Sequence, residues 1–278
     1  GSASLLPDVD RPALLWRLDV DAAGRLTSGR VRRALVRSRA KLDYRSAQAA
    51  LDAGRLGGTI AGLREVGEML AAAEVARGGV SLPLPDQVLA RGDDGRWRLA
   101  WRTPLAVEGW NAQLSLLCGR AAANLMLQGG VGVLRTLPPA DDGVLDRLRR
   151  SAAALGVEWP GDYPAFVRSL DPGSPEGAAL LNQAARVLRG AGYVAFGPGV
   201  AGVPQGDDAR HAAVAAAYAH VTAPLRRLVD RFAAEAALAV SSQVDVPEWV
   251  LAALPDVPGL LADARQREGV VARAVVDL

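Results

Sequence analysis

Two stretches near the start of the chain show the apolar and polar alternation typical of β-strands. Residues 13–20, ALLWRLDV, are followed by the turn sequence DAAG and then by residues 29–42, GRVRRALVRSRAKL. Strands that flank a short turn containing Asp and Gly pair as antiparallel ribbons. We therefore expect a two-stranded antiparallel ribbon here.

Apolar residues at helical spacing predict most of the remaining structure. Helices are expected over 45–53, 59–77, 107–127, 174–190, 247–254 and 257–278, and another from Asp141, which caps it. Strands are expected at SLPLP (81–85), in a hairpin around Asp93, Asp94 and Gly95, and at VGVLRTLPP (131–139). The predicted fold class is α+β, with a mixed or antiparallel sheet surrounded by helices in one domain over residues 1–278.

Residues 211–230, HAAVAAAYAHVTAPLRRLVD, collect both histidines of the chain and an arginine pair. Thr222 is a good N-cap and Pro224 suits a first helical turn, so a helix is predicted to begin here. Leu225, Leu228 and Val229 would face inward, with the arginines pointing away. Free amides, the helix dipole and planar guanidinium groups all favour a phosphate at such a helix entrance.

The second predicted strand is rich in arginine and leads to Tyr44. Arg30, Arg32, Arg33, Arg37, Arg39 and Lys41 precede the tyrosine ring. Proteins that bind single-stranded nucleic acid use positive charge to hold the phosphate backbone and aromatic rings to stack on the bases. The alternative from composition is a solvated edge strand whose charges prevent aggregation.

Overall composition limits these hypotheses. The net charge is +2, so bulk electrostatics do not make the chain a nucleic-acid binder, and its use of arginine, with Lys41 the only lysine, is also typical of a biased genome. There is no run of about eighteen apolar residues, and one cysteine, Cys118, suits a reducing compartment. A cytoplasmic protein without a membrane span is expected. Asp207, Asp208 and His211 are interpreted as a solvated loop and a packed histidine rather than a metal site.

The same residues resemble a known family. His211, Tyr218, His220, Thr222, Pro224, Arg226, Arg227 and Asp230 stand in register with the signature H-F-G-L-A-L … Y-x-H-F-T-S-P-I-R-R-Y-x-D of the ribonuclease II and ribonuclease R exoribonucleases. RSRAKLDY is similar to the family's R-S-x-A-x-L-x-Y, VEGWNAQLSLL to its V-E-E-F-M-L-x-A-N helix, and VLRTLPP to its L-x-R-x-H-x-x-P. Leu228, Leu82 and Ala272 depart from the pattern.

This resemblance implies a 3′-to-5′ exoribonuclease that hydrolyses single-stranded RNA processively to nucleoside 5′-monophosphates with Mg²⁺. The family's D-x5-D-x-D-D metal ligands are not found in this sequence. We therefore expect a monomeric part of a catalytic domain whose aspartates lie upstream and whose RNA-binding barrel lies downstream, with the remainder of the same protein as its partner. Alone, residues 1–278 are expected to be inactive.

Site residues follow from the resemblance and the chemistry together. Arg226 is the catalytic candidate, because a preorganised cation would stabilise charge on the scissile phosphate. The RNA-binding candidates are Tyr44, Arg37, Arg39, Arg77, Glu108, Arg135, His220, Thr222 and Arg227, and no metal ligand is assigned. The alternatives are a non-catalytic single-stranded RNA-binding module and an enzyme that binds a small phosphorylated metabolite.

Overall fold

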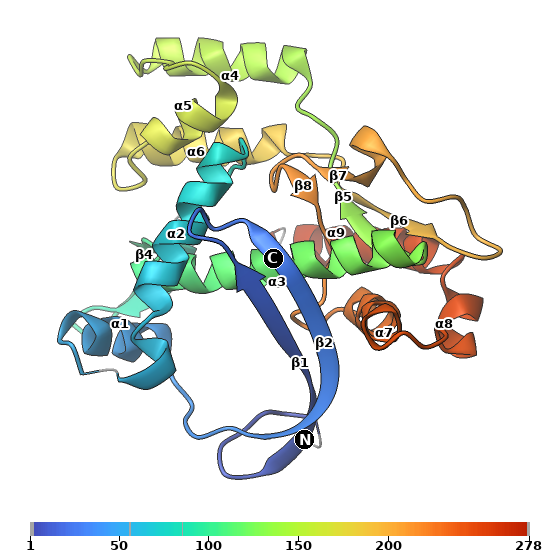
Figure 1. Ribbon diagram of the computed structural model, residues 1–278. Helices are drawn as coiled ribbons and strands as arrows, with labels where there is room; N and C mark the ends of the chain where they lie inside the picture. The colour runs from blue at the N-terminus through green and yellow to red at the C-terminus, as the bar shows by residue number, and fades with distance from the viewer. Residues whose placement is uncertain (1–2, 56, 85, 277–278) are drawn as a thin grey trace.

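The computed structural model describes residues 3–55, 57–84 and 86–276, and it confirms the α+β class. In this part of the chain the strands form four two-stranded antiparallel sheets. Parallel pairing is limited to isolated bridges such as Leu137 with His211. Helices surround these ribbons on several sides, as Figure 1 shows.

The N-terminal half is built on a ribbon and a long helix. β1 (Asp10–Val20) pairs with β2 (Leu26–Arg37), followed by α1 (Tyr44–Asp52), a short 3-10 turn (Gly58–Ile60) and α2 (Leu63–Ala76). The hairpin of β3 (Asp86–Arg91) and β4 (Trp97–Arg102) precedes α3 (Ala106–Gly129). The predicted ribbon, hairpin and long helix are confirmed. The predicted strand SLPLP is wrong for residues 81–84, which form no strand, and residue 85 lies outside the described residues.

The C-terminal half contains the remaining elements. They are β5 (Gly132–Thr136), α4 (Asp142–Ala154), α5 (Tyr163–Ser169), α6 (Pro175–Val187), β6 (Gly192–Phe196), a 3-10 turn (Gly206–Ala209), β7 (Arg210–His211), β8 (Ala216–Ala217), α7 (Val229–Ser242), α8 (Glu248–Ala253) and α9 (Val257–Val276). β5 pairs with β6 and β7 with β8. The helices α4 and α6 were predicted, whereas α5 and the strand β6 were not.

Two hydrophobic cores hold these elements. The larger includes buried residues of α3, β5, β6, α7 and α8, and the smaller lies among α4, α5 and α6. In Figure 1, α4, α5 and α6 form a separate layer above the ribbon of β1 and β2. None of the helices in the described part of the chain has the length and apolar character needed to cross a bilayer.

A glycine in α3 lets the segment after β8 pack closely against the larger core. A Cβ at Gly119 would collide with the Tyr218 ring and with the carbonyl oxygen of Ala219. The Ala219 amide donates to the Gly119 carbonyl at 3.1 Å, and the Arg135 amide of β5 donates to the Tyr218 carbonyl at 2.8 Å. Tyr218 and Ala219 are thereby fixed between α3 and β5, and this fixes the position of the residues that follow.

Candidate phosphate-binding site

The segment from Thr222 to Leu228 is a series of turns, and the predicted helix start at Thr222 is wrong. α7 begins at Val229, with Leu228 in the cap position. Leu225 is 68% exposed and Leu228 46%, so neither belongs to the buried stripe. The amides of Arg226 and Arg227 both donate to the Ala223 carbonyl, at 3.1 and 3.0 Å. A helix entrance therefore does not supply the phosphate site that the sequence suggested.

Asp230 is the physical reason for this difference. Its carboxylate is fully buried and accepts the Ala223 amide at 2.6 Å and the Arg227 Nε at 2.8 Å. Burial alone would lower the pKa of Arg227, but hydrogen bonding to Asp230 raises it above the usual value. A buried carboxylate needs such partners, and satisfying it bends residues 223–228 away from a helical path.

The same turn separates the roles of the two arginines. Arg227 is committed to Asp230, and its Nη2 also lies 3.5 Å from the Thr222 hydroxyl. Arg226 is exposed, and no ion pair or side-chain hydrogen bond of it is found within the described residues. Arg226 is therefore the guanidinium of the pair that is available to a ligand.

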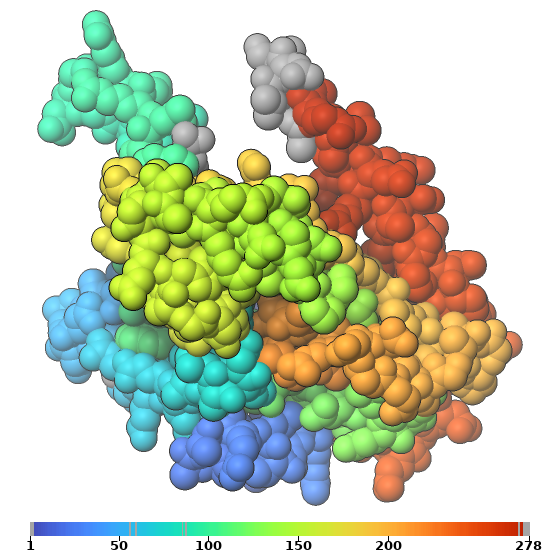
Figure 2. All heavy atoms as spheres, turned by 90° about the horizontal axis from the view of Figure 1, so that it is seen from above, coloured from blue at the N-terminus to red at the C-terminus, as the bar shows by residue number. Residues whose placement is uncertain are grey.

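Arg226 faces a groove of about 1250 Å³ between this turn, β6 and α9. We call it the arginine groove. Figure 2 shows α9, in red, on the outside of the molecule, beside the helices of residues 142–187, in yellow-green to yellow. The charged lining residues of the arginine groove are Arg135, Arg226, Arg227, Arg265, Glu268 and Arg273. Arg227 is already paired with Asp230, so among the described lining residues four further arginines stand against one carboxylate. Such a surface attracts anions, and planar guanidinium groups match the geometry of phosphate.

Aromatic rings and histidines support the inner wall of this groove. The Arg135 guanidinium lies over the Tyr193 ring, 4.6 Å from its centroid, and burial lowers the pKa of Arg135. The Tyr193 hydroxyl is hydrogen-bonded to His220 Nδ1 at 2.9 Å. The Tyr218 ring makes edge contacts with both His211 and His220. This packing holds Arg135 in the lining of the groove and His220 against Tyr193.

The two histidines are held neutral. Burial, followed by the nearby Arg227 and Arg135, lowers the pKa of His220 to about 4, with Asp230 opposing the shift. Burial and then Arg135 lower the pKa of His211 to about 4. The His211 Nδ1 is buried and has no hydrogen-bond partner in the described part of the chain. His211 is a packed histidine, as the sequence suggested.

These pKa values predict that the protein loses stability in weak acid. The unfolded histidines would take up protons near pH 6.5, whereas the folded ones do so near pH 4, so stability falls as pH drops through this window. His220→Asn keeps a polar group near Nδ1 but does not titrate. We expect urea unfolding to show a smaller loss for this variant between about pH 7 and about pH 4. Parallel pH profiles for the two proteins would contradict the expectation.

The structure brings together some of the predicted site residues. Arg135, Arg226 and Arg227 line the arginine groove, and His220 and Thr222 support it through Tyr193 and Arg227. Sequence reasoning missed Tyr193, Arg265 and Arg273. Arg265, Glu268 and Arg273 recur at helical spacing on α9, and that periodic pattern of charge could have indicated them.

Tyr44 lies in a different hollow. It is 46% exposed, its hydroxyl accepts from Asn111 Nδ2 at 3.0 Å, and it lines a cavity of about 650 Å³ between α1, α2 and α3. The linings of this cavity and of the arginine groove share no residue. Tyr44 and the arginine turn therefore line separate hollows.

The remaining predicted residues lie elsewhere. Arg37 pairs with Asp10 at 2.6 Å, and Arg39 is exposed just beyond β2. Glu108 pairs with Arg102 at 2.6 Å and caps the start of α3, and the Arg102 hydrogen bond lowers the pKa of Glu108. Arg77 ends α2 beside Arg120, where burial lowers the pKa of both and brings that of Arg120 to about 10.

The fold and the arginine groove define an α+β domain with a concave surface lined by arginines. A family profile described as RNB domain matches residues 1–238. The chain belongs to the RNB domain family.

Solved structures share this fold. Mycoplasma genitalium RNase R in complex with ribose methylated single-stranded RNA is 14% identical, with a TM-score of 0.76 over 95% of this chain and 43% of that one. The same RNase R in complex with double-stranded RNA has a TM-score of 0.75 at 14% identity, over 95% of this chain and 49% of that one. Yeast Ssd1, a pseudonuclease, has a TM-score of 0.67 at 15% identity, over 90% of this chain and 32% of that one. This chain thus spans less than half the length of these structural relatives. A search of curated proteins found no match.

Proposed function

We propose that the chain is part of a 3′-to-5′ exoribonuclease, which hydrolyses single-stranded RNA processively to nucleoside 5′-monophosphates. The observation that carries the proposal is the exposed Arg226 in an arginine-lined groove of an RNB domain. The solved complexes of the similar Mycoplasma RNase R with RNA support RNA as the ligand.

Arg226 has the catalytic role in this proposal. It would neutralise charge that develops on the scissile phosphate, and the turn held by Asp230 positions it before the substrate arrives. Arg135 and Arg227 would hold neighbouring phosphates. His220 and Thr222 would act beside them, through the contacts with Tyr193 and Arg227.

The other proposed RNA contacts lie outside the arginine groove. Tyr44 would pack a base or a sugar, and Arg37, Arg39, Arg77 and Glu108 would contact the rest of the strand. Arg37 already pairs with Asp10, but both side chains are about half exposed, and such pairs contribute about 0–1 kcal/mol, so RNA binding would displace this pair at low energetic cost. Glu108 is only 18% exposed and also caps α3, so it would contact RNA while keeping its pair with Arg102.

Magnesium is expected to take part through ligands outside residues 1–278. The described residues contain no group of three or more His, Cys, Asp or Glu side chains placed to hold a metal ion. The side chains present do not fit a magnesium site by themselves, so we derive no reaction step through the metal. We further propose that the protein is monomeric and cytoplasmic, and that residues 1–278 work with the remainder of the same polypeptide.

A second candidate function is a non-catalytic RNA-binding module. Two observations favour it: the described residues gather no metal-ligand set, and the fold is shared with yeast Ssd1, a pseudonuclease. The arginine groove would serve this function equally well. Leu82, Leu228 and Ala272, which depart from the family's sequence pattern, would also fit a non-catalytic module. The side chain of Ala272 lies outside those that the structure describes.

Incubating the intact protein with 5′-labelled single-stranded RNA and Mg²⁺ separates these functions. Stepwise shortening from the 3′ end would support the exoribonuclease. Tight binding without shortening would support the binding module and contradict hydrolysis.

The salt dependence of binding distinguishes RNA from a small phosphorylated ligand. Each phosphate contact with a single strand adds about 0.7 to the slope of log affinity against log salt concentration. A shallow slope would therefore indicate a small ligand with one phosphate.

A further inference from the structure

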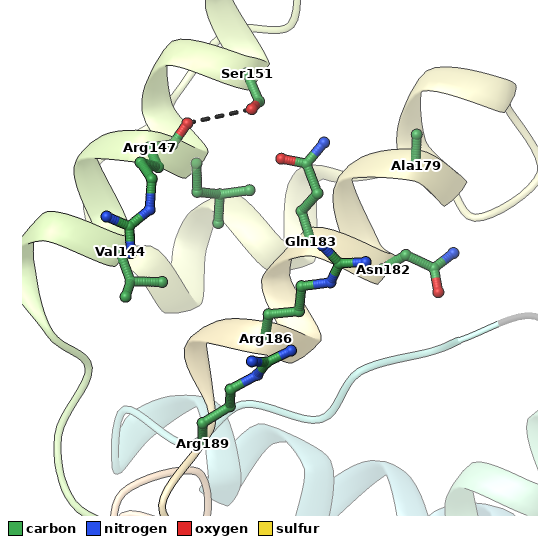
Figure 3. Close-up of a pocket in the computed structure, with 9 residues that line it drawn as sticks. Val144, Arg147, Ser151, Ala179, Asn182, Gln183, Arg186 and Arg189 are labelled. Carbon is green, nitrogen blue, oxygen red and sulfur yellow. Dashed lines mark hydrogen bonds between the residues drawn. The ribbon is translucent and has the colours of Figure 1, made fainter. Parts of the chain in front are cut away.

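A second basic groove lies between α4 and α6, outside the arginine groove. We call it the α4–α6 groove. It has a volume of about 590 Å³, and buried Leu148 lies at its base. Its polar lining residues are Arg147, Ser151, Asn182, Gln183, Arg186 and Arg189, and none of the described lining residues is a carboxylate. Figure 3 shows Arg147 on α4, with its side chain extending toward Val144, and, across the groove, Arg186 at the end of α6 and Arg189 just beyond it, which extend the other way.

The three arginines of this groove have no ion-pair partner among the described residues. On α4, the helix that carries Arg147, Arg149 pairs with Asp146 at 2.7 Å. A carboxylate is therefore available nearby, but it does not line the groove. Ser151 donates to the Arg147 carbonyl at 3.2 Å and Asn182 to the Ala178 carbonyl at 2.9 Å. Arg147, Arg186 and Arg189 therefore line one concave surface of a chain whose net charge is only +2. Such a surface concentrates anions.

The α4–α6 groove adjoins the arginine groove. Arg189 lines the first, and Ala191 and Gly192 line the second. Two residues of extended chain span about 7 Å at most. Arg265 of α9 donates to the Ala191 carbonyl at 2.8 Å and so ties this junction to the wall of the arginine groove. Cationic side chains thus line two neighbouring grooves.

We propose that the α4–α6 groove binds the sugar-phosphate backbone of an RNA strand, on the 5′ side of the nucleotides held in the arginine groove. This inference rests on the proposed function. A small anion would need only one groove, whereas two adjoining grooves lined by guanidinium groups suit a polymer with regularly spaced phosphates. Planar guanidinium groups bind phosphate oxygens in pairs, and Asn182 and Gln183 add further hydrogen-bonding groups at the same wall.

The triple variant R147Q/R186Q/R189Q tests this proposal. Its affinity for labelled single-stranded RNA is measured without divalent ions at several salt concentrations. For a strand of roughly 20 nucleotides we expect affinity to fall about tenfold or more and the salt slope to decrease by about 2, at about 0.7 per lost phosphate contact. A strand of roughly 4 nucleotides, enough for one groove, should bind unchanged.

A matched control removes the same charge elsewhere. Arg55, Arg96 and Arg150 are exposed and line neither groove, so R55Q/R96Q/R150Q should bind both strands as the wild type does. A second variant, Asn182→Arg, adds a cation to the α4–α6 groove and should bind the longer strand more tightly. Because this gain requires a folded protein, it separates loss of contact from loss of structure.

Three results would overturn the proposal. If the triple variant binds the longer strand as the wild type and the control do, this inference fails alone. If the wild type binds neither strand, the proposed function fails as well. If polyglutamate competes as well as RNA and the triple variant loses affinity for both, the groove accepts acidic polymers generally and the RNA assignment is wrong.

Discussion

Replacing Asp230 with alanine is expected to lower the free energy of unfolding by about 3–5 kcal/mol. The side chain of Asp230 is fully buried and that of Arg227 is 20% exposed, so the substitution leaves a largely buried guanidinium without its partner. The Ala223 amide also loses its acceptor. Urea denaturation would measure the loss, and the melting temperature should fall by roughly 10 °C.

Asp146→Ala is the matched control for Asp230. Asp146 also pairs with an arginine three residues away, but both side chains are about half exposed, at 57% for Asp146 and 47% for Arg149. Exposed pairs of this kind contribute about 0–1 kcal/mol. Equal losses in the two variants would show that burial of Asp230 does not determine the effect, and would contradict the account of the turn at residues 223–228.

Arg226→Ala is expected to reduce turnover of single-stranded RNA by about 10²–10³-fold in the intact protein. A preorganised donor aimed at developing charge is worth this much in other enzymes. Stability should change little, because Arg226 is exposed and has no ion-pair partner within the described residues. Single-turnover hydrolysis would report the chemical step, and RNA affinity measured without divalent ions would report binding.

Two further variants sharpen this test. Arg226→Lys keeps the charge but loses the forked geometry, so it should recover only part of the activity. Arg55→Ala removes an exposed arginine far along the sequence from the groove and should leave turnover unchanged. Wild-type turnover in Arg226→Ala would remove the catalytic assignment while leaving the family membership intact.

The elements with strong local signals were predicted well from sequence. The ribbon of β1 and β2, the β3–β4 hairpin, α3 and the Asp141 cap of α4 agree with the pattern of apolar residues, turns and caps. The departures have physical causes. α5 and β7 are too short to carry a periodic signal. The helix predicted at Thr222 fails because the Asp230 carboxylate accepts the Ala223 amide, a contact that a helix would prevent by holding these residues about 10 Å apart.

The candidate site was found only in part. A charged signature indicated Arg226 and Arg227, but did not show that Arg227 is bound to Asp230 while Arg226 is exposed. The wall contributed by α9 was missed, because Arg265 and Arg273 lie far along the chain from the signature. Tyr44, the predicted RNA-binding aromatic residue, and Arg226, the catalytic candidate, line separate hollows.

The sequence by itself determined the residue types and the local elements: an arginine pair after a histidine, an arginine-rich strand before Tyr44, and long helices with apolar faces. These depend on near neighbours, whose preferences are local. Only the tertiary structure decided which guanidinium groups remain unpaired and which of them share a groove. That choice depends on burial and on partners distant in sequence, such as the contact of Arg265 with Ala191 and the neutral histidines behind Arg135.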